Sequence, residues 1–141
     1  MGEARVSGRM GASAEAVWEL ISAFGDTSWM PGGAQVEVEG AGPGMARVLQ
    51  GPGGKIREQL ESLDREARRL VYTIPEGAPF PVTGYRATME VRGDPENAEL
   101  CWSCEFEPEG VSEEQARAQI EQIYGVMLGW IRDRLAATAK S

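Results

Sequence analysis

The stretch that decides the fold is residues 112–137, SEEQARAQIEQIYGVMLGWIRDRLAA. Ser112 and Gln115 have the spacing of a capping box, so they predict a helix that begins at Ser112. One stripe at helical spacing carries the apolar side chains of Ile120, Ile123, Tyr124, Met127, Ile131 and Leu135. A helix of roughly 39 Å with one broad apolar stripe predicts a concave sheet beneath it. We expect the two to enclose a space for a small molecule.

The residues before this helix predict short strands joined by tight turns. Their apolar and polar side chains alternate, and glycine-rich or Asp-Pro turns separate them. Short consecutive connections favour an antiparallel meander. The predicted strands are Ala4–Met10, Gln35–Gly40, Met45–Gln50, Lys55–Leu63, Arg69–Ile74, Thr83–Arg92 and Glu99–Phe106.

Two short helices are expected between the first two strands. Ser13 is typical of a helix N-cap, and the helix would run to Ala23 with Val17, Trp18, Ile21 and Phe24 facing inward. Residues 26–28 favour a second, shorter helical turn. The predicted fold class is therefore α+β, as a single domain spanning residues 1–141, with a seven-stranded curved antiparallel sheet wrapped around the C-terminal helix.

Alternation along the strands predicts which side chains face the helix. The inner set is Ile56, Glu58, Leu60, Ser62, Leu70, Tyr72, Ile74, Tyr85, Ala87, Met89, Val91, Leu100, Trp102, Cys104 and Phe106. The direction of Arg47 stays open. Glu58 is the notable member, because a carboxylate on an inner face needs a partner, a water network or a proton. It is a buried ion pair or rim residue, a polar anchor for a ligand, or a general acid or base.

Composition excludes several classes of function. The net charge of −8 argues against nucleic acid and against an anionic membrane surface. Without histidine, the chain lacks Ser-His-Asp chemistry and the commonest metal ligand. We therefore expect no metal and no cofactor. Neither a membrane-spanning apolar run nor a signal peptide is visible, so we expect a cytoplasmic protein.

Two motifs that suggest other chemistry have simpler explanations. Cys101 and Cys104 form a CxxC, but positions three apart on a strand point to opposite faces, so we expect one core cysteine and one surface cysteine. The glycine runs at 40–44 and 51–54 precede strands rather than helices, and hairpin turns explain them better than phosphate loops.

The chain resembles the START-related helix-grip superfamily, which includes polyketide cyclase-like proteins, the birch pollen allergen family and plant abscisic-acid receptors. The likeness covers nearly the whole sequence. It rests on residues 13–18, Trp29, the Gly42-x-Gly44 turn, Arg47, residues 57–61 with Asp64, residues 72–74, Pro81-Val82 with Tyr85, and Trp102. It implies seven antiparallel strands that grip a C-terminal helix, with two short helices closing one end.

The resemblance also implies a set of cavity-lining positions. Matching the abscisic-acid receptor pattern places Glu58, Tyr72, Ile74, Tyr85 and Ala87 in the cavity. The complete predicted ligand-binding set is Trp29, Glu58, Tyr72, Ile74, Tyr85, Ala87, Trp102, Phe106, Ile123, Met127 and Ile131. The loops at 51–53 and 77–81 lack the bulky gate residue and the latch histidine of the hormone receptors, which argues against hormone recognition.

Three functions follow as hypotheses. The first is binding or transport of a small hydrophobic or aromatic molecule, oriented by Glu58, Tyr72 and Tyr85. The second is a polyketide cyclase, aromatase or lyase in which Glu58 or Tyr85 transfers a proton. The third is a protein-interaction module, a homodimer included, with Leu128 and Trp130 as the contact residues.

Overall fold

The computed structural model describes residues 1–32, 36–51 and 53–139. Gln35 of the predicted second strand and Pro52 of the predicted turn lie outside this part of the chain. The strands are β1 (Gly2–Arg9), β2 (Glu37–Glu39), β3 (Ala46–Gly51), β4 (Gly54–Asp64), β5 (Arg69–Glu76), β6 (Val82–Gly93) and β7 (Ala98–Pro108). The helices are α1 (Ala14–Ser22) and α2 (Glu113–Ala139).

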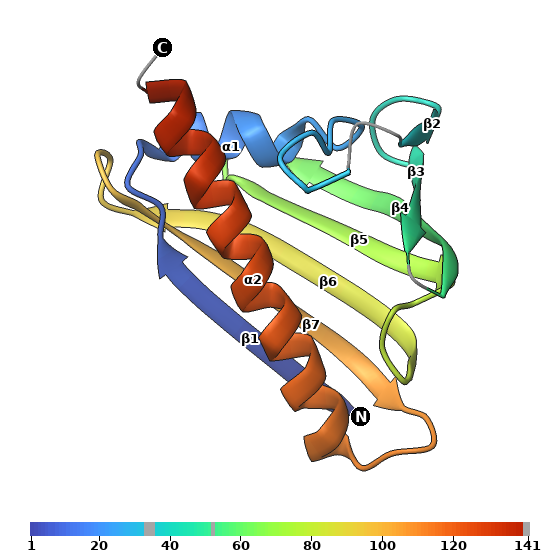
Figure 1. Cartoon of the computed structure of the whole chain (residues 1–141). Helices are drawn as coiled ribbons and strands as arrows, with labels where there is room; N and C mark the ends of the chain where they lie inside the picture. The colour runs from blue at the N-terminus through green and yellow to red at the C-terminus, as the bar shows by residue number, and fades with distance from the viewer. Residues whose placement is uncertain (33–35, 52, 140–141) are drawn as a thin grey trace.

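The strands form one antiparallel sheet in the order β1-β7-β6-β5-β4-β3-β2. Only β1 is out of sequence order, because it pairs with the last strand, β7. The sheet curves behind α2 (Figure 1). The helix lies diagonally over the sheet and contacts mainly β1 and β7, and α1 covers one end of the sheet. The predicted fold class is confirmed.

Both predicted helix starts are confirmed at atomic level. The Ser13 hydroxyl accepts a hydrogen bond from the Ala16 N–H at 3.1 Å. At α2, the Ser112 hydroxyl accepts from the Gln115 N–H at 3.1 Å, and the Gln115 side chain accepts from the Ser112 N–H at 3.0 Å. These bonds satisfy N–H groups that the first turn of a helix leaves without partners.

The second short helix is not present among the described residues. Residues 23–30 form successive turns instead, with hydrogen bonds from Asp26 N–H to the Ala23 carbonyl and from Met30 N–H to the Thr27 carbonyl. The Asp26 carboxylate accepts from the Ser28 N–H at 3.0 Å, and this local bond competes with a helical backbone.

The predicted inner rows of β5, β6 and β7 are confirmed. The side chains of Tyr72, Tyr85, Met89 and Trp102 are at most 3% exposed. In β4 the alternation fails at Ser62, which is exposed because the register shifts between Leu60 and Ser62. A β-bulge of this kind turns later side chains to the other face.

Two predicted surface residues are buried. Cys101 lies on the outer face of the sheet but is only 5% exposed, because the Arg92 guanidinium lies against its sulfur at 2.9 and 3.1 Å. Leu128, expected to be a partner contact, is 3% exposed and belongs to the core. The buried face of α2 extends beyond the predicted apolar stripe and includes Leu128. The prediction that Leu128 contacts a partner protein was therefore wrong.

Two arginines fasten α2 to β1. Arg117 Nε donates to the Glu3 carbonyl at 2.7 Å, and Arg132 Nε donates to the Arg9 carbonyl at 2.9 Å. The two bonds lie near opposite ends of β1 and bind its backbone at the edge of the sheet. They fix the helix across the strands. In the described part of the chain, no helix is both long and apolar enough to cross a membrane.

Candidate functional site

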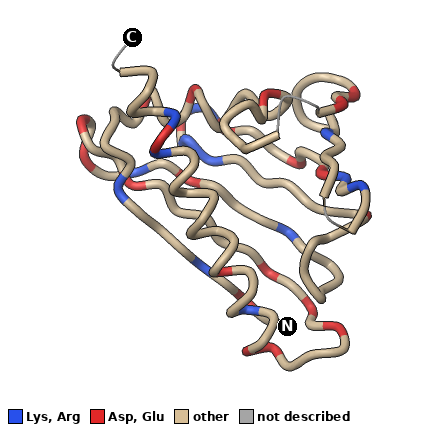
Figure 2. Tube along the Cα trace, viewed as in Figure 1, with Lys and Arg blue, Asp and Glu red and all other residues tan. Residues whose placement is uncertain are grey.

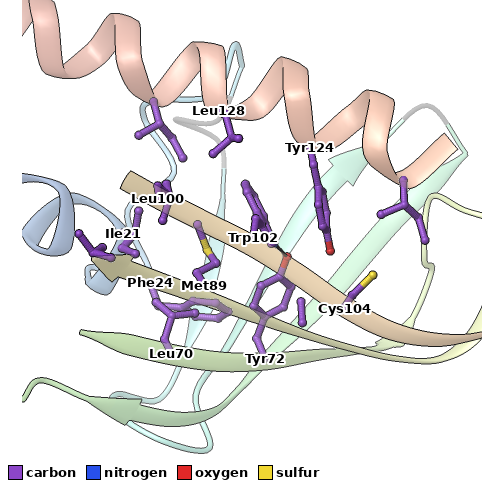
Figure 3. Close-up of a cluster of buried hydrophobic side chains, with 14 of the residues drawn as sticks. Ile21, Phe24, Leu70, Tyr72, Met89, Leu100, Trp102, Cys104, Tyr124 and Leu128 are labelled. Carbon is purple, nitrogen blue, oxygen red and sulfur yellow. Dashed lines mark hydrogen bonds between the residues drawn. The ribbon is translucent and has the colours of Figure 1, made fainter. Parts of the chain in front are cut away.

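Four aromatic side chains meet between the sheet and α2. The Tyr85 and Tyr124 hydroxyls are hydrogen-bonded to each other, and the Tyr72 hydroxyl lies 3.5 Å from that of Tyr85. Trp102 Nε1 donates to the Tyr72 hydroxyl at 3.1 Å. The Trp102 and Tyr124 rings stack with centroids 4.7 Å apart. We call Tyr72, Tyr85, Trp102 and Tyr124 the aromatic cluster; Figure 3 shows Tyr72, Trp102 and Tyr124 converging from the sheet and α2.

The sheet register explains this convergence. Tyr72 on β5 pairs with Ala87 on β6, and Ala87 pairs with Cys104 on β7. The small Ala87 side chain leaves room above the sheet in the middle of this row. Tyr124 extends from α2 toward the sheet, close to Tyr72, Trp102 and Cys104 (Figure 3). The helix and three strands thus bring their polar aromatic atoms to one place.

The hydroxyls of the aromatic cluster stay protonated. Burial is the main reason that the pKa values of Tyr72, Tyr85 and Tyr124 lie well above the ordinary 10.0. The negative charge of Glu58 raises the pKa of Tyr72 further, and the neighbouring phenols act in the same direction on Tyr85. At neutral pH these groups therefore act as hydrogen-bond donors and acceptors, not as bases.

Glu58 is paired with Arg47, whose direction the sequence left open. The two face each other across β3 and β4, and Arg47 Nε donates to Glu58 Oε1 at 2.7 Å. Arg47 Nη1 also donates to the Phe24 carbonyl at 2.9 Å, and the guanidinium lies 3.9 Å from the centroid of the Phe24 ring. The pair therefore joins the sheet to the segment after α1.

Side chains occupy the space where an open cavity was expected. Among the described residues, the aromatic cluster, Phe106 and Ile131 fill the region between the sheet and α2, and each is at most 3% exposed. An open interior cavity is therefore not confirmed. A ligand at this place would have to displace aromatic side chains or lift α2.

A hollow lies at the rim of the sheet near this cluster. Its volume is about 470 Å³. We call it the rim hollow; it is lined by Gly53, Gly54, Ile56, Gly77, Ala78, Pro79 and Phe80. The Phe80 ring is 7% exposed, and its centroid lies 5.7 Å from that of Tyr85. Phe80 therefore separates the rim hollow from the aromatic cluster.

The predicted ligand-binding residues lie in three different parts of the structure. Glu58, Tyr72, Tyr85 and Trp102 lie in or beside the aromatic cluster. Ile74, Ala87, Phe106 and Ile131 are buried core residues, and Ile123 and Met127 are half-buried at its margin. Trp29 is also buried in the core, but away from the cluster, where it lines a surface hollow together with Trp130 and Arg134. Ligand contact by these residues stays a prediction.

The sequence prediction did not include Arg47, Tyr124, Phe24 and Phe80 in the site. A tyrosine in the apolar stripe of α2 was a usable signal, because a buried phenol usually has a hydrogen-bond partner. Arg47 gave no such signal, since the short strand β3 shows no clear alternation. Phe80 lies in a loop, where sequence periodicity gives no direction.

The chain matches a known family over almost all of its length. The family is described as polyketide cyclase/dehydrase and lipid transport, and it matches residues 1–136. A comparison with curated proteins found no match.

Solved structures agree with this assignment. The protein XoxI from Bacillus cereus is 32% identical, with a TM-score of 0.83 over 96% of each chain. A protein from Thermobifida fusca is 30% identical, with a TM-score of 0.83 over 97% of this chain and 95% of that one. Norcoclaurine synthase from Thalictrum flavum is 20% identical, with a TM-score of 0.77 over 99% of this chain and 88% of that one, and shares the fold. The chain therefore belongs to the polyketide cyclase/dehydrase and lipid-transport family, within the START-related helix-grip superfamily.

Proposed function

We propose that this protein binds or transports a small hydrophobic molecule that carries one hydrogen-bonding oxygen, held between the sheet and α2. The observation that carries the proposal is the aromatic cluster. Three phenol hydroxyls and one indole N–H meet in an otherwise apolar interior. Ligand pockets combine apolar walls with a few convergent polar groups. A ligand would reach the polar groups of the cluster by displacing aromatic side chains or by lifting α2.

The polar atoms of the cluster suggest how the ligand is oriented. A ligand oxygen placed between the Tyr85 and Tyr124 hydroxyls would replace their bond to each other with two bonds to the ligand. The surrounding apolar side chains would supply most of the affinity, at about 25 cal/mol per Å² of buried apolar surface. Glu58 does not bind the ligand directly in this arrangement, because one of its carboxylate oxygens already accepts a hydrogen bond from Arg47.

The rim hollow suggests a route for the ligand. It lies between the loops before β4 and after β5, and its lining is mainly glycine, alanine, proline and apolar side chains. Phe80 lines this hollow, and its ring also lies next to the Tyr85 ring. Rotation of the Phe80 ring would open a path from solvent to the aromatic cluster.

A displacement experiment with matched ligands tests the proposal. The neutral dye anilinonaphthalene should bind with a saturable rise in fluorescence, and naphthol should displace it at lower concentration than naphthalene. A single hydrogen bond makes this difference about threefold to tenfold. Tyr124→Phe should reduce the difference, whereas Val126→Ala, on the exposed face of α2, should leave it unchanged.

Two outcomes would contradict the proposal. The first is no saturable binding of dye, naphthol or naphthalene. The second is that the Tyr124→Phe variant prefers naphthol over naphthalene by the same factor as the wild type. Phe80→Ala adds a kinetic check, because dye association should become faster without a matching loss of affinity.

An enzyme of the cyclase or lyase type is the second candidate. The family description, which includes polyketide cyclases and dehydrases, supports it. The geometry supports it less well, because Glu58 is held by Arg47 and Tyr85 is a protonated phenol with a raised pKa. A Glu58→Gln variant that binds ligand but loses turnover would favour it.

A further inference from the structure

The outer face of the sheet, opposite α2, has a hollow of its own. The strand registers place Arg5 opposite Ser103, Ser103 opposite Thr88, and Thr88 opposite Val71. These residues form one row across β1, β7, β6 and β5. Serine, threonine and valine have short side chains, so this row is lower than the rows beside it. A hollow of about 390 Å³, the outer hollow, lies over it.

The neighbouring rows form the walls of the outer hollow. On one side Arg69 pairs with Glu90, and Glu90 pairs with Cys101. On the other side Arg86 of β6 lines the hollow. The walls therefore consist mainly of long charged side chains, whereas the floor carries two hydroxyl groups.

Arginine dominates the lining of the outer hollow. Arg5, Arg69, Arg86 and Arg92 all line it, and among its described lining residues Glu90 is the only carboxylate. Acidic and basic positions are interspersed along the strands (Figure 2), and the whole chain has a net charge of −8. A concentration of four guanidinium groups is therefore unusual for this chain.

Three of these guanidinium groups are partly occupied. Arg86 forms a two-point pair with Glu61, Arg69 Nε donates to Glu90 at 3.0 Å, and Arg92 donates to the Cys101 sulfur. A guanidinium has five N–H donors, so each of these groups keeps free donors.

The remaining polar groups of the outer hollow have no such partners. Within the part of the chain that the structure describes, the Arg5 side chain makes no hydrogen bond or ion pair. The hydroxyls of Thr88 and Ser103, on the floor beside it, also lack a hydrogen-bond partner among the described residues. Arg5 and the two hydroxyls thus offer donors that converge on one place.

We propose that the outer hollow binds an oxyanion of the phosphate class, with Arg5 as the main ligand and the Thr88 and Ser103 hydroxyls as further donors. The planar fork of arginine matches phosphate geometry. A smaller adjoining hollow shares Arg5, Arg86, Thr88 and Ser103 with the outer hollow, but it is less suited to an anion because Glu3 and Glu105 line it as well. Two sources supply this group, a free phosphate anion and a phospholipid headgroup.

An NMR titration with inorganic phosphate tests this site directly. Sodium chloride keeps the ionic strength constant, and the backbone N–H signals of Thr88 and Ser103 report binding. We expect saturable shifts in the wild type and an affinity about tenfold lower in Arg5→Ala, since a charge-assisted bond is lost. Arg65→Ala, in the exposed turn after β4, is the matched control and should bind like the wild type.

Vesicles distinguish the sources of the phosphate group. Binding to vesicles that contain phosphatidic acid, but not to pure phosphatidylcholine, would assign a lipid headgroup if Arg5→Ala weakens it. Binding of inorganic phosphate without vesicle binding would assign a free anion. The proposal is overturned if neither phosphate nor vesicles bind, or if Arg5→Ala binds as tightly as the wild type.

Discussion

Arg47 and Glu58 form an ion pair inside the protein, where β3 and β4 face each other. Their Nε and Oε1 atoms are 2.7 Å apart, and their side chains are 5% and 10% exposed. The Arg47 guanidinium also bonds the Phe24 carbonyl and lies 5.8 Å from the Tyr72 ring centroid. The pair therefore connects the segment after α1 with β3 and β4, and it lies beside Tyr72 of the aromatic cluster.

Removing one partner of this pair should be costly. Arg47→Met leaves the Glu58 carboxylate buried without its cation, and we expect the free energy of unfolding to fall by about 3–5 kcal/mol. Urea denaturation of the purified protein measures this change.

The double substitution Arg47→Met with Glu58→Leu is the control for this prediction. It removes both charges and replaces them with apolar side chains, which is often nearly neutral for stability. We expect the double variant to be more stable than Arg47→Met alone. If both variants lose the same free energy, the ion pair is not the reason for the loss.

The tyrosines should make stability fall at alkaline pH. All three tyrosines of the chain belong to the aromatic cluster, and their folded-state pKa values lie above the unfolded value of 10.0. Below pH 10 both states are protonated and the full stability remains. Above it the unfolded state releases protons first, so stability falls by up to about 1.4 kcal/mol per pH unit for each tyrosine.

Tyrosinate absorbance and circular dichroism, recorded on the same samples, check this prediction. We expect tyrosinate to appear only as the protein unfolds. A tyrosine that ionises with an ordinary pKa while the circular dichroism stays native would show that the cluster is open to solvent.

Gly77 lines the rim hollow, and its backbone lies very close to the backbone of Lys55 in β4. Its φ is +78°, and a Cβ atom there would lie 2.1 Å from the Lys55 carbonyl oxygen. Gly77→Ala should therefore lower the unfolding free energy well beyond the roughly 1 kcal/mol of a left-handed alanine.

Gly84 provides the matched position for this test. Its φ is +62°, but no atom lies within 4 Å of an added Cβ. Gly84→Ala has the same backbone strain without the contact to Lys55. Thermal unfolding should give a clearly lower midpoint for Gly77→Ala; equal midpoints would mean that the contact with β4 does not matter.

The two cysteines should react at different rates. Burial raises the pKa of both thiols, to about 11 for Cys104, so neither is a thiolate at neutral pH. Cys101 is covered mainly by the flexible Arg92 side chain, whereas Cys104 faces the core. Arg92→Ala should therefore speed the modification of Cys101 by a thiol reagent and leave Cys104 slow, as mass spectrometry of the labelled peptides would reveal. Faster labelling of Cys104 would contradict this.

Local sequence signals predicted most of the fold. The capping residues Ser13 and Ser112 and the alternation in β6 act over a few residues, and the structure agrees with them. The bulge near Ser62 depends on pairing with the neighbouring strand β5, and the turns after Ala23 depend on local hydrogen bonds such as that from the Ser28 N–H to the Asp26 carboxylate; alternation alone reports neither.

The candidate site was only partly predictable for a related reason. The inward direction of Tyr72 and Tyr85 follows from strand parity. The bond between Tyr85 and Tyr124 joins residues 39 positions apart and depends on how α2 crosses the sheet. The filled interior likewise depends on the combined volume of four large rings, which no single motif specifies.

An NMR titration of the protein with naphthol tests the central claim most directly. The account predicts saturable shifts of the ring signals of Tyr72, Tyr85 and Tyr124, with contacts between naphthol protons and these rings. Shifts confined to the surface hollow beside Trp29 and Trp130, with unchanged tyrosine signals, would contradict it.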